Sequence, residues 1–278
     1  MLSAREFASN ANQSFALPDI CVKIRRMLDS DRANTAEIGD VVATDPALTS
    51  KLLKLANSSL FRFESQIDAI DKAVKVIGGE ALYNMVMAET ASSAFEHFSS
   101  DVIDLKRFWL QSIYASLVAK HLAKIAQVRG SARFFLIGLL HNLGELVVAV
   151  QAPNLAIRCN AYTTQTPPWI LQTQVLGFTY ADCSAELMRQ WQLPSNLYQP
   201  LLFAHNEYKA LKTREIGLTY IALRAAVSMI ENEKYQINQL INPNILQATG
   251  LEEVDVQDAI KFAYMEANNL LDIFQPKR

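Results

Sequence analysis

Apolar residues recur at helical spacing along almost the whole chain, and no alternating β-strand pattern persists beyond a few residues. Leu48, Leu52 and Leu55, for example, fall on one stripe, because residues three and four apart are neighbours on a helix surface. Glycine and proline number 9 each among 278 residues, about half of their usual share of roughly 12%. Sandwiches and barrels need more turn residues, so the sequence predicts an all-α, multi-helix bundle.

Start and stop signals divide this pattern into helices. Asp45 followed by Pro46 is an N-cap with proline at the first helical position, and Gly78 is expected to end a helix in the left-handed conformation. Asn57 and Ser58 are expected to end the helix that carries Leu55. For Asn57 two interpretations stand, a buried hydrogen-bonding node or a ligand-binding residue. Longer helices are predicted over about 80–94, 105–126, 180–191, 213–231 and 254–273.

Charge is scarce in this chain. Hydrophobic residues make up 50% and charged residues 19%, with a net charge of −2. A general nucleic-acid binder usually has a basic excess, so no nucleic-acid partner is expected. Two small basic groups, Lys23, Arg25 and Arg26 and then Arg129 and Arg133, are expected to be solvated surface residues. The shortage of charge suggests that part of the surface is covered by a partner, with a second copy of the chain as one candidate.

The sequence also indicates where the protein works. Its three cysteines, Cys21, Cys159 and Cys183, are isolated and odd in number, which favours buried thiols in a reducing cytoplasm. No apolar run approaches the ~20 residues that span a bilayer, and residues 1–14 lack the apolar core of a secretory signal. A cytoplasmic protein without membrane contact is therefore expected.

Two stretches of the chain are distinctive. The first holds Asp45, Pro46, Asn57, Ser58 and Gly78, and the second reads GLLHNLGEL over residues 138–146. Together with Trp109, Leu176-Gly177 and Trp191-Gln192-Leu193-Pro194, they resemble the HD-related output domain (HDOD) family. This family is a bacterial signalling branch of the HD-type metal-dependent phosphohydrolase superfamily. We assign a structural role to the motif residues Asp45, Pro46, Asn57, Ser58, Gly78, Trp191 and Pro194.

The resemblance also implies a domain plan. Residues 1–14 form an N-terminal tail, and residues 15–212 form the HDOD domain, with an N-terminal helical part at about 15–100 and an HD-like part at about 101–212. Residues 213–278 are expected to be a C-terminal helical extension packed on the main domain.

In the HD superfamily, a His-Asp pair, an earlier His and a later Asp bind divalent metal that activates water on a phosphoester. Carried over to this sequence, the earlier His position holds Gln111, His141 is retained, the paired Asp is Asn142, and Leu223 is the expected occupant of the later Asp position. Two further His positions of relatives correspond here to Tyr180 and to the pair Ala204-His205. The resemblance therefore implies a vestigial pocket of Gln111, His141, Asn142, Tyr180 and His205.

Asn142 keeps the shape of aspartate but lacks the negative charge that a hard cation such as Mg²⁺ prefers. No catalytic residue and no cofactor are therefore expected, and if a metal binds at all, its ligands are His141 and His205. For His141 two interpretations stand, a helix-end histidine bonded to a backbone carbonyl or a residue with a role in the pocket. Trp109, Trp169 and Trp191 are expected to be core anchors.

Three functions follow from these observations. The first is a non-catalytic signalling module that acts through a protein partner, in line with the resemblance and the eroded ligand set. The second is a metal-dependent phosphohydrolase that acts on nucleotides or other phosphoesters through an unusual ligand set. The third, nucleic-acid or nucleotide binding without chemistry, rests only on the two small basic groups.

Overall fold

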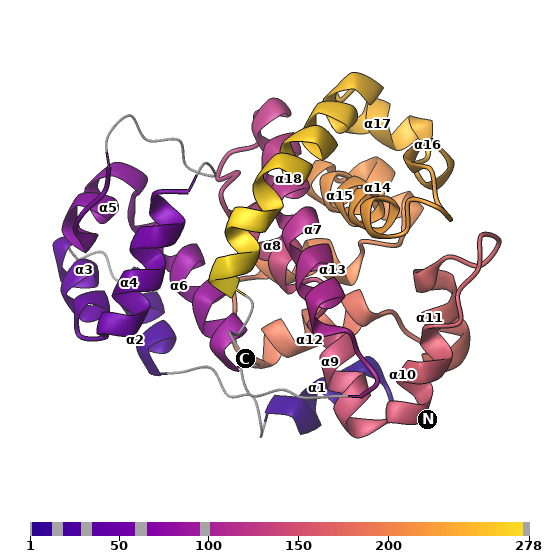
Figure 1. Cartoon of the computed structure of the whole chain (residues 1–278), viewed down its shortest axis with the longest axis horizontal. Coiled ribbons are helices and arrows are strands. Elements are labelled where there is room, and N and C mark those ends of the chain that lie inside the picture. The colour runs from indigo at the N-terminus through magenta and orange to yellow at the C-terminus, as the bar shows by residue number, and fades with distance from the viewer. Residues whose placement is uncertain (1, 13–18, 29–34, 59–65, 95–100, 275–278) are drawn as a thin grey trace. The chain divides into compact units, whose positions relative to one another are not determined.

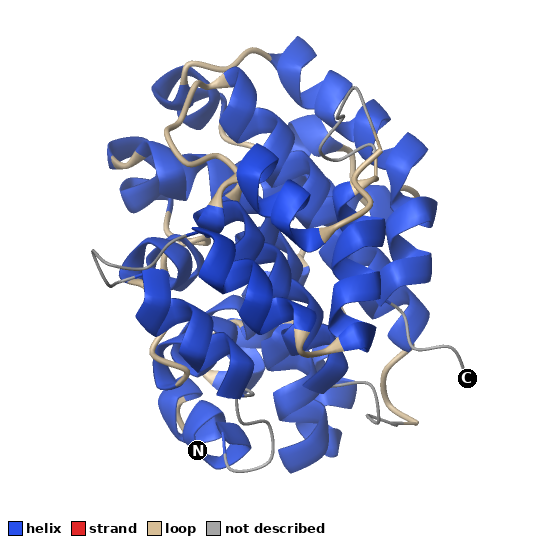
Figure 2. Cartoon of the chain, turned by 90° about the vertical axis from the view of Figure 1, so that its left-hand side faces the viewer, coloured by secondary structure: helices blue, strands red, loops and turns tan. Residues whose placement is uncertain are grey.

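The computed structural model of the chain describes residues 2–12, 19–28, 35–58, 66–94 and 101–274. Within these ranges every regular element is a helix and no strand occurs (Figure 2). The all-α prediction is therefore confirmed.

The chain divides into two compact units. Unit 1 comprises residues 1–15 and 98–265, and unit 2 comprises residues 16–97 and 266–278. Unit 2 holds the helices α2 (Asp19–Leu28), α3 (Thr35–Ala43), α4 (Pro46–Ala56), α5 (Ile70–Ile77) and α6 (Gly79–Ala94). Unit 1 holds α1 (Ala4–Asn12), α7 (Leu105–Ile125), α8 (Arg133–Leu140), α9 (Leu143–Gln151), α10 (Pro153–Cys159), α11 (Pro168–Leu176), α12 (Tyr180–Gln190), α13 (Ser195–Leu202), α14 (Glu207–Lys212), α15 (Arg214–Ile230), α16 (Ile237–Leu240), α17 (Pro243–Thr249) and most of α18 (Glu253–Phe274) (Figure 1).

In unit 2, α6 is the buried helix, since residues 82–90 are all shielded from solvent. Helices α2, α4 and α5 pack against it, and α3 packs against α2, α4 and α5. The stripe predicted on α4 is correct, because Leu48, Leu52 and Leu55 are all buried.

The core of unit 1 is the packing of α8 and α15 against α7 (Figure 1). All eight residues of α8 are buried, which is typical of a helix that is surrounded on every side. Helix α12 packs against α1, α9 and α13. These contacts bring α7, α9, α12 and α15 together around the segment that carries the GLLHNLGEL motif.

Two glycines of this motif allow backbones to approach closely. A Cβ atom at Gly138 of α8 would lie well inside van der Waals distance of the Ser116 backbone on α7. A Cβ atom at Gly144 of α9 would meet the carbonyl oxygen of Tyr180 on α12 in the same way. Both helix pairs are therefore close enough that only glycine fits at these two positions.

The N-terminal cap of α4 is as predicted. Asp45 accepts hydrogen bonds from the backbone N–H groups of Ala47 and Leu48, each at 3.0 Å, and Pro46 is the first helical residue. The helix ends at Asn57, whose amide Nδ2 donates to the carbonyl of Ile67 at 2.7 Å and whose Oδ1 accepts from the Ile67 N–H at 2.7 Å. This confirms the hydrogen-bonding node, but the expected burial of Asn57 is wrong. The residue is exposed and has right-handed helical angles.

The other motif residues also end or begin helices. Ser58 Oγ donates to the Leu55 carbonyl at 2.6 Å, and Gly78 ends α5 with a positive φ of 83°. Its ψ of 158° is extended, so Gly78 departs from the left-handed helical angles that were expected. Trp191 ends α12 and is buried, and Pro194 precedes α13.

Part of the predicted N-terminal tail is a helix of unit 1. Residues 4–12 form α1, where Phe7 is buried, packs against Phe178 and accepts a hydrogen bond at its carbonyl from Gln151 at 2.9 Å. Of the predicted C-terminal extension, residues 213–265 belong to unit 1 and residues 266–278 to unit 2. The domain limits stay a prediction.

One described stretch, Arg133–Gln151, is apolar and long enough to cross a membrane by composition. It corresponds to α8 and α9, and 89% of its apolar window is buried inside the protein. This burial is typical of core helices. The three cysteines are free and buried, as predicted.

The expectation that Arg133 is a solvated surface residue is wrong. Its side chain is largely buried at the start of α8, donates to the carbonyls of Arg129 and Gly130, and lies 3.5 Å from the Glu215 carboxylate. The guanidinium therefore joins the loop before α8 to α15 through its Nη1 and Nη2 atoms.

Candidate functional site

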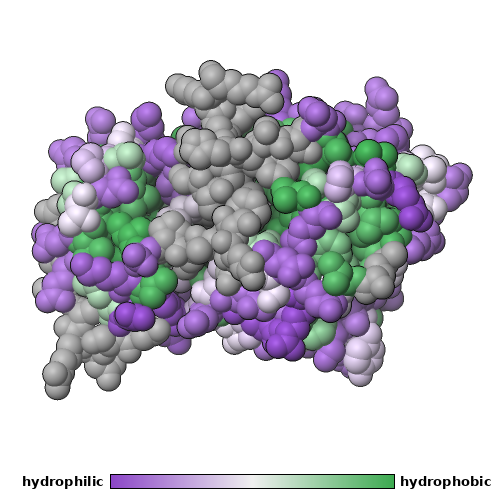
Figure 3. All heavy atoms as spheres, turned by 90° about the horizontal axis from the view of Figure 1, so that it is seen from below, coloured by the Kyte–Doolittle hydropathy of each residue, from purple (hydrophilic) through white to green (hydrophobic). Residues whose placement is uncertain are grey.

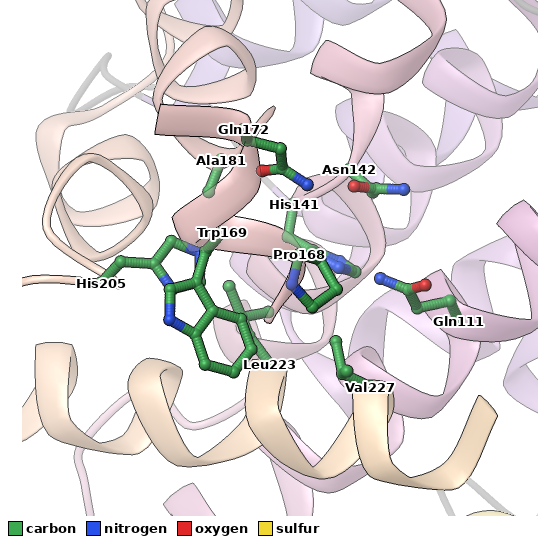
Figure 4. Close-up of a pocket in the computed structure, with 10 residues that line it drawn as sticks. All are labelled: Gln111, His141, Asn142, Pro168, Trp169, Gln172, Ala181, His205, Leu223 and Val227. Carbon is green, nitrogen blue, oxygen red and sulfur yellow. The ribbon is translucent and has the colours of Figure 1, made fainter. Parts of the chain in front are cut away.

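A small cavity of about 30 Å³ lies within unit 1 beside His141. We call it the His141 cavity. It is lined from α7, the α8–α9 junction, α11, α12, the segment after α13, and α15 by Gln111, His141, Asn142, Pro168, Trp169, Gln172, Ala181, His205, Leu223 and Val227 (Figure 4). A second cavity of about 20 Å³, the Tyr180 cavity, shares Gln111, Asn142, Pro168, Gln172 and Val227 with the first. The two cavities are therefore adjacent lobes of one polar pocket.

His141 lies at the C-terminal end of α8 and is only 4% exposed. Its Nδ1 is 2.6 Å from the carbonyl oxygen of Gly138, three residues earlier. Burial lowers the pKa of the imidazole to about 4, so the ring is neutral at pH 7. The interpretation of His141 as a helix-end histidine bonded to a carbonyl is confirmed, and the same ring also lines the pocket.

Asn142 and Glu145 form a buried pair at the start of α9. The Asn142 amide donates to the Glu145 carboxylate, and both residues are nearly inaccessible to solvent. Burial raises the pKa of Glu145, whereas the nearby Arg107 and the hydrogen bond from Asn142 lower it. Glu145, the acidic residue of the motif, thus already accepts a hydrogen bond from Asn142, and the Arg107 charge offsets part of the shift that burial causes.

Arg107 connects this pair to α15. Its guanidinium lies 2.9 Å from the Glu231 carboxylate and donates to the Tyr162 hydroxyl, which itself donates to Glu231 at 2.8 Å. Burial raises the pKa of Tyr162 above its usual range, so the phenol keeps its proton. Each charge in this part of the wall has an opposite charge or a hydrogen-bonding partner.

The backbone around the motif is held by Ser184 of α12. Its hydroxyl accepts from the Gly144 N–H at 2.8 Å and lies 2.8 Å from the His141 carbonyl and 2.9 Å from the Tyr180 carbonyl. Helix α12 begins with a capping box between Thr179 and Asp182. These local bonds fix Tyr180 at the edge of the pocket.

Tyr180 lines the second lobe and not the first. Its N–H donates to the Gln172 Oε1 at 3.0 Å, while its buried hydroxyl finds no oxygen or nitrogen partner in the described part of the chain. Burial raises the pKa of the phenol far above its usual range, and the Glu145 carboxyl and the Cys159 thiol reinforce the shift.

The other side of the pocket is aromatic. Trp169 stacks on His205 with ring centroids 5.3 Å apart and an angle of 11° between the rings (Figure 4). Trp169 is half-buried and forms a wall of the cavity, so its expected role as a core anchor is wrong. Trp109 and Trp191 are buried, as expected.

Arg224 lies beside this stack. The guanidinium carbon is 4.4 Å from the Trp169 ring centroid and 3.2 Å from that of Tyr220. Its Nη1 donates to the Tyr220 carbonyl at 3.2 Å. Burial lowers the pKa of Arg224 to about 10 and, together with the Arg224 charge, keeps the pKa of His205 well below its usual range. Both pocket imidazoles are therefore neutral.

A divalent metal does not fit these residues. No group of three or more His, Cys, Asp or Glu side chains in the described ranges converges on one point. Leu223, at the expected later Asp position, brings an aliphatic side chain into the cavity wall, and Asn142 brings an amide. Two neutral imidazoles remain, whereas hydrolytic metals usually have three or more protein ligands.

The sequence matches the model of one protein family, described as the HDOD domain, over residues 15–207. This match covers more than half of the chain. The chain belongs to the HDOD domain family.

Relatives of this HDOD chain were compared by sequence and by structure. A protein of Treponema pallidum (strain Nichols), described only as uncharacterized, is 29% identical over 204 residues, which is 70% of this chain and 39% of the relative. The chain thus spans about two fifths of the length of that relative.

Two solved structures share the fold. One, from Shewanella amazonensis SB2B and named as a candidate phosphohydrolase, has a TM-score of 0.72 and 21% identity and covers 96% of this chain and 97% of its own. The other, from Marinobacter aquaeolei VT8 and named as a candidate signal transduction protein, has a TM-score of 0.69 and 19% identity and covers 98% of this chain and 65% of its own. At these identities the likeness establishes the fold alone.

The fold brings the predicted pocket residues of the HDOD chain together. Gln111, His141, Asn142, His205 and Leu223 line the first lobe, and Tyr180 joins Gln111 and Asn142 in the second. Sequence reasoning missed Gln172, Arg107 and Arg224. A signal for Arg224 was present, because it is the only charged residue in the apolar run from Ile216 to Ile230. Gln172 and Arg107 lie in ordinary amphipathic segments and gave no such signal.

Proposed function

We propose that this HDOD chain is a non-catalytic regulatory module of a bacterial signalling pathway. It acts in the cytoplasm by binding a protein partner, and a second copy of the chain is one candidate. The observation that carries the proposal is the bond between Asn142 and Glu145. Position 142, which would supply a metal-binding carboxylate, holds an asparagine. The Asn142 amide donates a hydrogen bond to Glu145, the acidic residue of the motif.

The surface is in keeping with a covered interface. Several large apolar side chains of unit 1 are more than half exposed, among them Val150, Ile157, Val254 and Met265. Figure 3 shows green hydrophobic groups set among purple hydrophilic ones on the face that it presents. Single exposed apolar residues are ordinary, so the variants below test whether either pair belongs to an interface.

Light scattering and a pull-down from the native host test this proposal. The expected result is a dimer or a stably retained protein. Two double variants then locate the surface, Val150→Asp with Ile157→Asp and Val254→Asp with Met265→Asp, since each places charge on one exposed region only. A strict monomer that retains no protein contradicts the proposal.

A second candidate function is metal-dependent phosphoester hydrolysis. One observation favours it, because the two imidazoles of His141 and His205 line the same cavity. Elemental analysis of the purified protein and a phosphatase panel with Mn²⁺, Mg²⁺ and Fe²⁺ decide between the two functions. Stoichiometric metal, with turnover that His141→Ala abolishes, establishes the hydrolase.

A further inference from the structure

The polar pocket has fixed hydrogen-bonding directions. The Gly138 carbonyl only accepts, so the His141 Nδ1 carries the hydrogen and the Nε2 of this neutral ring is left with a free lone pair. The Tyr180 N–H can only donate, so its partner on Gln172 is the Oε1 atom. The two N–H groups of the Gln172 Nε2 therefore remain unused as donors. The Asn142 Nδ2 donates to the Glu145 carboxylate, which leaves the Asn142 Oδ1 as an unused acceptor.

These free atoms lie on the walls of the two lobes. Asn142 and Gln172 border both lobes and His141 borders the first. Gln111, which also borders both, makes no side-chain hydrogen bond to any described residue. His205 borders the first lobe, and its buried Nδ1 has no hydrogen-bonding partner among the described residues. Buried polar groups are normally satisfied, so this convergence of unused donors and acceptors indicates a bound polar group.

The walls set the charge and shape of that group. Apart from its two histidines, the His141 cavity is lined only by side chains that carry no charge. The second lobe adds Arg107 and Glu145, two groups of opposite charge. The stacked rings of Trp169 and His205 form a flat side, and Pro168, Leu223 and Val227 add apolar surface (Figure 4). A planar, uncharged group with both donors and acceptors matches these walls.

The volumes limit how much of a ligand enters. The lobes of about 30 and 20 Å³ each have room for roughly one water-sized group. A primary carboxamide places one such group, its NH₂ or its oxygen, in each lobe. Half-buried Trp169 at the wall provides an aromatic surface for the rest of the molecule.

We propose that the pocket binds a small molecule through a planar, uncharged carboxamide or ureide group. The ligand NH₂ donates to His141 Nε2 and Asn142 Oδ1, and its carbonyl accepts from Gln172 and Gln111. This inference rests on the proposed non-catalytic function, since it uses the same pocket without a metal.

Nicotinamide and nicotinate are the matched probes, because they differ only in the replacement of the amide NH₂ by a carboxylate oxygen. Titrations of the full chain are followed by isothermal calorimetry and by the ¹⁵N shift of His141. For a ligand of this size we expect a dissociation constant for nicotinamide on the order of 1 mM. Nicotinate is expected to bind at least about tenfold more weakly, because two acceptors would face its carboxylate.

Gln111→Leu is the test variant, since the Gln111 side chain makes no hydrogen bond to another described residue, and circular dichroism checks that the variant is folded. It is expected to weaken nicotinamide binding about tenfold, whereas the control Gln199→Leu, at an exposed position on α13, leaves binding unchanged. Equal binding of nicotinate, or unchanged binding by Gln111→Leu, overturns the inference.

A separate titration with Mn²⁺ alone distinguishes this inference from the proposed function. If Mn²⁺ shifts the His141 signal and nicotinamide does not bind, both fail together. If the folded protein responds neither to Mn²⁺ nor to nicotinamide, the inference alone is overturned and the non-catalytic function stands.

Discussion

The two sequence motifs of this chain place their polar residues in opposite environments. In unit 2, Asp45 and Asn57 lie at exposed helix ends and bond to backbone groups. In unit 1, His141, Asn142 and Glu145 are buried, the His141 ring bonds to the Gly138 carbonyl, and Asn142 donates to Glu145. The first motif starts and stops helices, which many residues can do at modest cost. The second keeps polar groups where an unpaired group would cost several kcal/mol, so its sequence is far more constrained.

The largest effect is expected from glycine substitution in the buried motif. Gly138→Ala drives a methyl group into the Ser116 backbone, and we expect a loss of about 3 kcal/mol or more in the free energy of unfolding. Gly78→Ala is the matched change in the exposed motif. It meets no atom within 4 Å, but its φ of 83° and ψ of 158° lie in a region that is essentially restricted to glycine, so we expect a smaller loss of about 2 kcal/mol. Urea unfolding measures both, and equal losses would break the comparison.

The next prediction concerns the charge of the buried motif. Asn142→Asp places a second carboxylate against Glu145, and we expect a loss of about 3 kcal/mol at pH 8. The loss should shrink as the pH falls toward 5, because one shared proton removes the repulsion. Chemical unfolding at both pH values measures it. Recovery by Mn²⁺ at pH 8 would instead show that the pocket can hold a metal.

The free energy of unfolding of unit 1 is expected to depend on pH through His141. Its pKa is about 4 in the folded protein and 6.5 as an unperturbed group, so the unfolded chain binds the proton first as the pH falls. Stability is therefore lost between about pH 6.5 and pH 4, by about 3 kcal/mol. His141→Gln removes this titration, and its unfolding free energy should fall less over the same range. If the unfolding free energies of the unmodified protein and of His141→Gln fall equally over this pH range, the burial argument is contradicted.

The smallest effect is expected at the exposed cap. Asp45→Ala removes two hydrogen bonds of 3.0 Å to the first turn of α4, and we expect a loss of about 1 kcal/mol. Asp45→Asn keeps an acceptor and should be nearly neutral, which makes it the control. Thermal unfolding monitored on α4 resolves the difference. A loss as large as that of Gly138→Ala would remove the contrast between the motifs.

Much of the fold was predictable because helix boundaries are decided locally. Asp45-Pro46, Pro168 and Gly177 each fix a start or a stop through their own backbone preferences, and the helices begin or end at these residues. The burial of single side chains was less predictable. The three-residue spacing of Phe262 and Met265 predicts that both lie on one side of the last helix. Phe262 is buried, yet Met265 is 69% exposed, since periodicity gives a face and not the neighbour that covers it.

The pocket was predictable only as a set of residues. The resemblance placed Gln111, His141, Asn142 and His205 together, and the fold brings them to one cavity. It gave no indication that Trp169 leaves the core to stack on His205, or that Arg224 is buried beside it. Those contacts join α11, the segment after α13, and α15, and their positions depend on packing between segments far apart in the chain.

The sequence by itself determined the helical class, the helix limits and the loss of the acidic metal ligand at Asn142, because each depends on residue chemistry and short-range spacing. Only the tertiary structure decided which atoms of the pocket remain unused. Burial fixes the neutral state of His141, and Gly138, Glu145 and Tyr180 set the orientation of His141, Asn142 and Gln172. Hydrogen-bond direction belongs to a pair of groups and not to one residue, so it appears only when the chain has brought both partners together.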